Sequence, residues 1–239
     1  MLNFQFGPVF AEAPLLIHGV LLTIALSLAA IVLGTLLALL LCAARFLFGR
    51  TVQVLVDAYV EAMRNTPFLV QLFIVFFGLP LIGLRMSNIE AGLLAMVLNL
   101  AAYSTEIIRA GIDATHKSQV EAGVSLALTR IQVFRHVVLM PALAKVWPAL
   151  SSQYVLMLLA SSIVSFISVE ELSGAAAIIE QNTFRSFETY IVATLLYLAL
   201  ALGLKALLFA VGRRAFPRGT GTMRQQRRAA GTTRQRGQA

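Results

Sequence analysis

The chain has 239 residues, of which 59% are hydrophobic and only 13% are charged, and its mean hydropathy is +0.83. This composition excludes an ordinary soluble domain and predicts an all-α integral membrane protein with about five spanning helices. The net charge of +8 falls largely on an arginine-rich C-terminal segment, a placement typical of the cytoplasmic side of a membrane protein. The only cysteine and three scattered histidines predict neither a disulfide nor a metal site.

The first 14 residues contain no lysine or arginine and are expected outside the membrane. Residues 15–44 then carry no formal charge and predict the first span, which ends at Arg45 and Arg50. Because positive residues favour the cytoplasmic side, this order places the N terminus outside.

Residues 51–63 are amphipathic and are expected to enter the membrane from the cytoplasmic interface. Asn65-Thr66-Pro67 predicts a break or kink, after which an apolar run completes the second span at about 66–84. Arg85 and Glu90 flank a short outer turn.

The third span, about 91–108, carries Asn99, Tyr103 and Glu106 at spacings of four and three, so the three share one helix face. Such a stripe has two interpretations, hydrogen bonding between helices and part of a substrate pathway. For Asn99 and Tyr103 we weigh these equally. Glu106 lies near Arg109, which favours a local ion pair.

Residues 119–150 form a comparatively polar and basic stretch between apolar segments. They predict a short helix with Ala122, Gly123 and Ala127 on its surface, where small side chains let a partner approach closely. Pro141 and Pro148 are expected to separate an interfacial helix from the fourth span, about 149–169. Just before this stretch, Gly111–Ser118 departs from a phosphate-binding loop at His116, so any ATP site is expected on a partner chain.

Residues 168–188 are rich in glutamate and favour an outer loop containing an amphipathic helix. The fifth span is predicted at about 189–211, with Lys205 near its inner end. Residues 213–239 follow as a basic cytoplasmic tail that we expect to be disordered and close to anionic membrane lipid, with no nucleic acid as partner.

The stretch beginning at Glu121 resembles the cytoplasmic Glu-Ala-Ala loop of type I ABC importer permeases. Glu121 and Ala122 match the pattern, Gly123 stands for its second alanine, Ala127 for its glycine, and Pro141 comes one residue late. Three further segments are similar to the polar amino acid subfamily, so that the resemblance covers about residues 15–212: EAMRNTPFLVQLF (61–73), LNLAAYSTEIIRAGI (98–112) and SSIVSFISVEEL (161–172).

The resemblance implies the permease subunit of an importer in the bacterial inner membrane, paired with a second, identical or paralogous, permease chain. An external binding protein would deliver an amino acid, and separate ATPase subunits would hold ATP and magnesium, so this chain itself would have no cofactor and no catalytic residue. The implied ATPase-docking residues are Glu121, Ala122, Gly123, Ala127 and Arg130. The implied pathway residues are Arg64, Asn65, Thr66, Gln71, Asn99, Tyr103, Ser161 and Ser162, and the implied outer gate contains Glu170 and Glu171.

Many members of the subfamily have Lys-Asp where this chain has Leu159-Ala160. The alternative is a self-sufficient secondary transporter, for which repeated halves and buried coupling carboxylates are expected and are not visible here. A membrane-embedded enzyme is disfavoured because no Ser-His-Asp, paired-carboxylate or histidine-rich group is evident.

Overall fold

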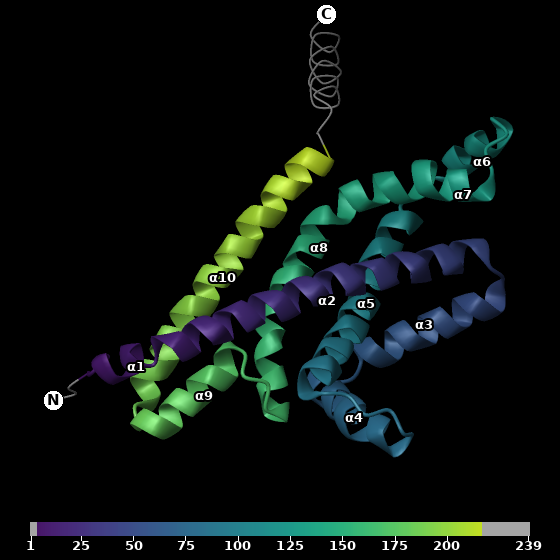
Figure 1. Ribbon diagram of the computed structural model, residues 1–239. Helices are drawn as coiled ribbons and strands as arrows, with labels where there is room; N and C mark the ends of the chain where they lie inside the picture. The colour runs from purple at the N-terminus through teal and green to yellow at the C-terminus, as the bar shows by residue number, and fades with distance from the viewer. Residues whose placement is uncertain (1–3, 217–239) are drawn as a thin grey trace, which may run out of the picture.

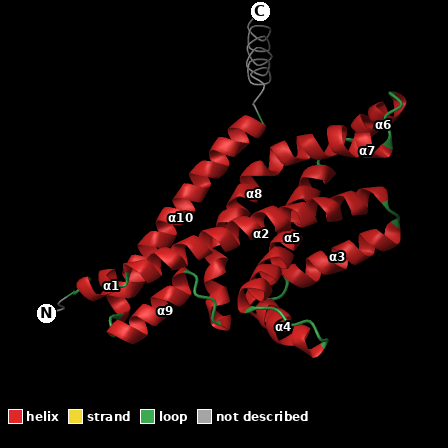
Figure 2. Ribbon diagram, viewed as in Figure 1, coloured by secondary structure: helices red, strands yellow, loops and turns green. Residues whose placement is uncertain are grey.

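The computed structural model describes residues 4–216, and the larger part of the predicted basic tail lies outside these residues. Every regular element in the described part of the chain is a helix (Figures 1 and 2). In chain order these are α1 (Gly7–Ala11), α2 (Ala13–Leu47), α3 (Arg50–Arg64), α4 (Phe68–Leu81), α5 (Asn88–Asp113), α6 (Lys117–Ser125), α7 (Arg130–Gln132), the π-helix η1 (Val133–Leu139), α8 (Met140–Ala160), the 3-10 helix η2 (Ser161–Ile167), α9 (Leu172–Thr183) and α10 (Ser186–Ala215).

Four helical runs are long and apolar enough to cross a membrane: α2, α5, the run from α7 through η2, and α10. The pair α3 and α4 makes a fifth crossing if it is counted as one broken span. The expected all-α architecture of about five spans is therefore confirmed.

The second expected span differs from a single straight helix. Helix α4 has 14 residues, about 21 Å of helix, which is shorter than a hydrocarbon core of about 30 Å. Helices α3 and α4 meet at an angle of 109° at the predicted break around Pro67. Proline has no N–H to continue the α3 ladder, so the chain changes direction there.

Helix α2 packs along α5 and α9 through a row of small side chains. Its buried positions recur every three or four residues and include Gly19, Thr23, Ala30, Gly34 and Ala38. Gly19 and Thr23 contact the start of α9. A Cβ at Gly34 would lie 3.1 Å from the Leu100 side chain of α5. Close approach of small residues is the usual basis of helix association in membranes, because lipid removes the hydrophobic driving force.

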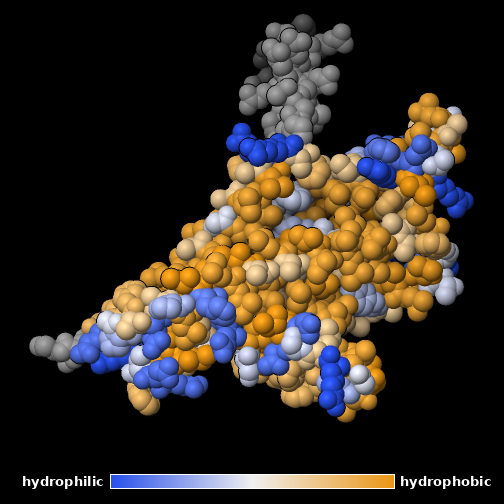
Figure 3. Space-filling model, in the orientation of Figure 1, coloured by the Kyte–Doolittle hydropathy of each residue, from blue (hydrophilic) through white to orange (hydrophobic). Residues whose placement is uncertain are grey.

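Polar ends and an apolar middle are visible on the surface (Figure 3). Hydrophilic residues gather around α1 and α9 at one end, and around α6, α7 and the last turn of α10 at the other (Figures 1 and 3). Exposed leucine, valine and phenylalanine side chains occupy the region between, for example Leu36 and Leu198. This pattern matches a protein whose sides face lipid.

The run from α7 to η2 is continuous over Arg130–Ile167, so the expectation that Pro141 and Pro148 separate two helices is wrong. Pro141 occupies the first turn of α8, immediately after the π-helical turns of η1, and Pro148 lies inside α8. The wider π-helical turn gives the ring of Pro141 room, and membrane helices tolerate internal proline when neighbouring structure supports the backbone. The predicted interfacial helix and fourth span are one continuous helical run, which bends along its length (Figure 1).

Candidate functional site

The break between α3 and α4 is held by side chains of the predicted pathway residues. Asn65 donates from Nδ2 to the Glu61 carbonyl (2.9 Å), and Thr66 donates from Oγ1 to the Ala62 carbonyl (2.8 Å). The Glu61 carbonyl also accepts the backbone N–H of Asn65, so the Asn65 amide adds a second bond there. Thr66 supplies a partner for the Ala62 carbonyl, which lies beyond the last backbone bond of α3.

Gln71 connects this break to α5. Its Nε2 donates to the Met63 carbonyl (2.7 Å) and to both oxygens of Thr66, and its Oε1 accepts from Nδ2 of Asn99 (2.8 Å). Gln71 and Asn99 are buried. Both amides are thereby used in hydrogen bonds between helices, which supports the structural interpretation of Asn99.

A charged group lies beside these amides. Glu106 accepts from Nη2 of Arg109 (2.6 Å) and lies 3.4 Å from Nη1 of Arg64. The guanidinium of Arg64 lies over the Tyr103 ring, 5.9 Å from its centroid, while the Tyr103 hydroxyl donates to the Arg64 carbonyl (3.4 Å). The predicted Glu106–Arg109 pair is confirmed, and Arg64 joins it from α3.

Six of the predicted pathway residues are therefore brought together where α3, α4 and α5 meet: Arg64, Asn65, Thr66, Gln71, Asn99 and Tyr103. The other two lie on η2, where the hydroxyl groups of Ser161 and Ser162 donate to carbonyls of their own helix, Leu158 and Leu159. In the described part of the chain neither serine side chain hydrogen-bonds to the cluster, and their bonds support the tight turn in which α8 ends.

The predicted docking residues lie on a helical hairpin at the end of the molecule opposite α1 and α9 (Figure 1). Helix α6 packs back against η1, and a capping box between Thr129 and Gln132 starts α7. Glu121, Ala122, Ala127 and Arg130 are exposed on this hairpin. We call the segment 117–139 the α6–η1 hairpin.

Gly123 differs from the expectation that it lies on the partner-facing surface. It is buried, and a Cβ there would lie 3.2 Å from Val133 of η1. Its small size lets α6 approach η1 closely, so it shapes the hairpin from within. A helix of nine residues has two faces, and the sequence did not show which one turns inward.

The two predicted gate glutamates have different environments. Glu170 is exposed, whereas the Glu171 side chain is fully buried and caps α9 by accepting from the N–H groups of Ser173 (2.8 Å) and Gly174 (3.1 Å). It also accepts from the hydroxyls of Thr23 on α2 (3.1 Å) and Tyr197 on α10 (2.5 Å). Burial raises the pKa of the Glu171 carboxyl, against the opposing effect of these hydrogen bonds.

The sequence interpretation missed Thr23 and Tyr197 as partners of Glu171. Thr23 lies in the row of small residues on α2, which was a visible signal that another element packs there. Tyr197 has no such signal, because its position opposite Glu171 depends on how α10 crosses α9.

Comparisons with known proteins agree with this architecture. Residues 30–217 match the family described as binding-protein-dependent transport system inner membrane component. The arginine transport permease ArtQ of Bacillus subtilis is 31% identical over 202 residues, 84% of this chain and 92% of that protein. The glutamine transport permease GlnP of Escherichia coli is 30% identical over 215 residues, 89% of this chain and 98% of that protein.

Solved structures give the same result. One described as an amino acid ABC transporter with histidines matches with a TM-score of 0.79 and 34% identity, over 89% of this chain and all of that chain. The methionine transporter MetNI shares the fold at a TM-score of 0.69 and 16% identity, over 84% of this chain and 96% of that chain. The chain belongs to the binding-protein-dependent transport system inner membrane component family and is an ABC importer permease of the bacterial inner membrane.

Proposed function

We propose that this permease carries a polar amino acid or a related compound, and that a separate ATPase drives it through the α6–η1 hairpin. Relatives named for glutamine and arginine transport support the substrate class. The alternative was a secondary transporter, which works without a binding protein. Membership of a family described as binding-protein-dependent does not support that alternative.

The observation that carries the coupling proposal is that the hairpin continues without a break into the membrane-spanning helix α8. Glu121 is exposed on α6, α6 packs on η1, and η1 runs without a break into α8 and η2. A partner that displaces α6 would therefore move α8 as a lever. The free energy for the conformational change of the permease comes from a partner that binds its two conformations with different affinity. We assign ATP and magnesium to that partner, the ATPase.

The ion pair between Arg64 and Glu106 supports an amino acid as the substrate. It offers a guanidinium and a carboxylate 3.4 Å apart, both partly exposed. An amino acid carries one charge of each sign, and either could exchange with this pair as the substrate passes. A second permease chain and an external binding protein complete the proposed importer.

The orientation follows from the basic residues at the helix ends. Arg50 begins α3, Arg130 and Arg135 lie on the hairpin, and Arg213 lies in the last turn of α10. These helix ends lie toward one end of the molecule (Figure 1). The opposite end carries mainly glutamates, including Glu170 and Glu188. By the positive-inside rule, the hairpin faces the cytoplasm and α9 faces outward.

The test is purification of the tagged full-length chain from its native membrane, with Glu121→Arg and Glu170→Arg compared. Both substitutions put arginine in place of an exposed glutamate, one on α6 and one at the opposite end. We expect an ATPase to co-purify with the wild type and with Glu170→Arg, and to be lost from Glu121→Arg. Retention of the ATPase by Glu121→Arg would contradict docking at α6.

The substrate class is tested by uptake of labelled amino acids into cells that lack other importers for them. We expect energy-dependent uptake of glutamine, arginine or histidine that requires both this chain and the ATPase. Uptake that continues without the ATPase and follows an ion gradient would instead support a secondary transporter.

A further inference from the structure

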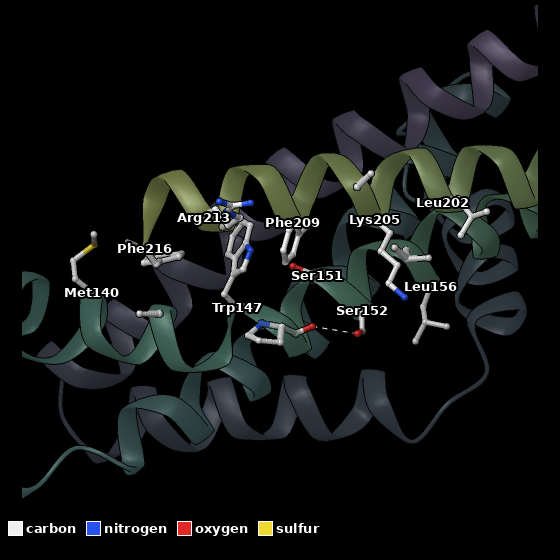
Figure 4. A pocket seen from close by; sticks show the side chains of 15 residues that line it. Met140, Trp147, Ser151, Ser152, Leu156, Leu202, Lys205, Phe209, Arg213 and Phe216 are labelled. Atoms are coloured by element: carbon white, nitrogen blue, oxygen red, sulfur yellow. Dashed lines mark hydrogen bonds between the residues drawn. The ribbon is translucent and has the colours of Figure 1, made fainter. Parts of the chain in front are cut away.

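A groove of about 1800 Å³ lies between α8 and α10 (Figure 4). Its walls are mainly apolar and include Leu156 on α8 and Leu202 and Phe209 on α10. Two cationic side chains, Lys205 and Arg213, line it as well, both from α10. Such a groove suits an amphiphile with an apolar chain and an anionic headgroup.

The two cations share a helix face. They are eight residues apart, about 12 Å along α10, with Phe209 between them and the Arg213 guanidinium 5.8 Å from the centroid of its ring. Among the residues that the structure describes, no acidic side chain lines the groove and neither cation forms an ion pair. Lys205 lies deeper in the span than Arg213, but near enough to the inner end for its exposed side chain to extend toward the interface, where lipid phosphates lie.

Trp147 fixes the two helices beside the groove. Its indole N–H donates to the Leu208 carbonyl of α10 (3.2 Å). This contact requires Gly212, because a Cβ there would overlap the indole nitrogen. Since the N–H is already used, the ring of Trp147 contributes apolar surface to the groove, beside Phe216 at 5.5 Å between centroids.

We propose that this groove binds an anionic phospholipid, with its phosphate at Lys205 and Arg213 and its acyl chain along the apolar walls. Basic pockets between membrane helices bind such headgroups, and the inner leaflet is rich in anionic lipid. A second copy placed groove to groove would bring like charges together, because a two-fold interface joins a patch to itself. The site lies outside the α3–α5 cluster and the hairpin, and it goes beyond the proposed transport function.

Trp147 is the only tryptophan of the chain, so its fluorescence reports on the groove directly. The full-length chain is reconstituted in phosphatidylcholine bilayers, and brominated phosphatidylglycerol or brominated phosphatidylcholine is added as quencher. At about 1 kcal/mol for each of the two cations near the surface, we expect phosphatidylglycerol to be favoured by about thirtyfold. Lys205→Gln together with Arg213→Gln should reduce this preference to about one.

Arg214→Gln is the matched control, because Arg214 is adjacent and exposed and lines only a smaller neighbouring pocket of about 350 Å³, not the groove itself. It should retain most of the preference, and an unchanged Trp147 emission maximum in each variant verifies that α8 and α10 still pack. Equal quenching by the two lipids, or the same loss in Arg214→Gln, would overturn the proposal. So would a disulfide between two chains through Leu202→Cys, since it would put a second copy in the groove.

Discussion

Ala127 adopts a backbone conformation that its side chain disfavours. Its φ is +56°, in the left-handed region, at the turn that ends α6. The family pattern has glycine at this position, and the structure supplies the reason, since only glycine enters this region without strain. This chain therefore forms the turn at a local energetic cost.

We expect Ala127→Gly to stabilise the protein slightly. Removing left-handed strain of about 1 to 2 kcal/mol outweighs the extra entropy of glycine in the unfolded chain, about 0.5 to 1 kcal/mol. The free energy of unfolding should rise by about 0.5 to 1 kcal/mol, measured as a higher thermal midpoint in detergent.

Ala122→Gly is the control, because Ala122 is exposed within α6 and has no positive φ. Glycine in a helix interior costs about 1 kcal/mol, so this variant should melt earlier. If both variants lower the midpoint equally, the strain assigned to Ala127 is not real.

At the scale of elements, Glu171 joins three helices through one carboxylate. It starts α9 and binds hydroxyl groups of α2 and α10, so the position of α9 depends on it. The resemblance implied an outer gate that contains both Glu170 and Glu171. In the structure Glu171 is buried and connects three helices, whereas Glu170 lies on the surface.

Glu171→Ala should destabilise the fold by about 2 to 4 kcal/mol. It removes a helix cap and leaves the Thr23 and Tyr197 hydroxyls without this acceptor in a buried place. Glu170→Ala should change the free energy of unfolding by less than about 0.5 kcal/mol, as exposed substitutions generally do. Thermal unfolding of both variants in detergent measures the difference, and a similar midpoint for the two would argue against the connector role.

The elements differ in how far the sequence predicts them. A charge-free run predicts α2 well, and a run whose one charge is Lys205 predicts α10, since the cost of charge in lipid leaves few alternatives. The helical run containing α8 was divided wrongly, because whether Pro141 breaks or only bends a helix depends on the turns before it. The contacts of Gln71 with Asn99 and of Glu171 with Tyr197 required tertiary geometry, which helical spacing on one element does not contain.

For the whole molecule, the uneven charge at the two ends predicts how it lies in the membrane. The end with the α6–η1 hairpin carries most of the lysine and arginine of the described residues, and the end with α9 carries glutamates. Two strongly exposed positions report on these ends: Leu126, 75% exposed in the hairpin, and Phe184, 88% exposed after α9.

Single cysteines at these positions test the orientation in a Cys42→Ala background, which removes the only native thiol. A membrane-impermeant maleimide added to intact spheroplasts should label Phe184→Cys, because the positive-inside rule puts α9 outside. Leu126→Cys should react only after the membrane is permeabilised. The reverse pattern would place the hairpin outside, where no ATPase could reach it, and would contradict both the orientation and the coupling proposed for Glu121.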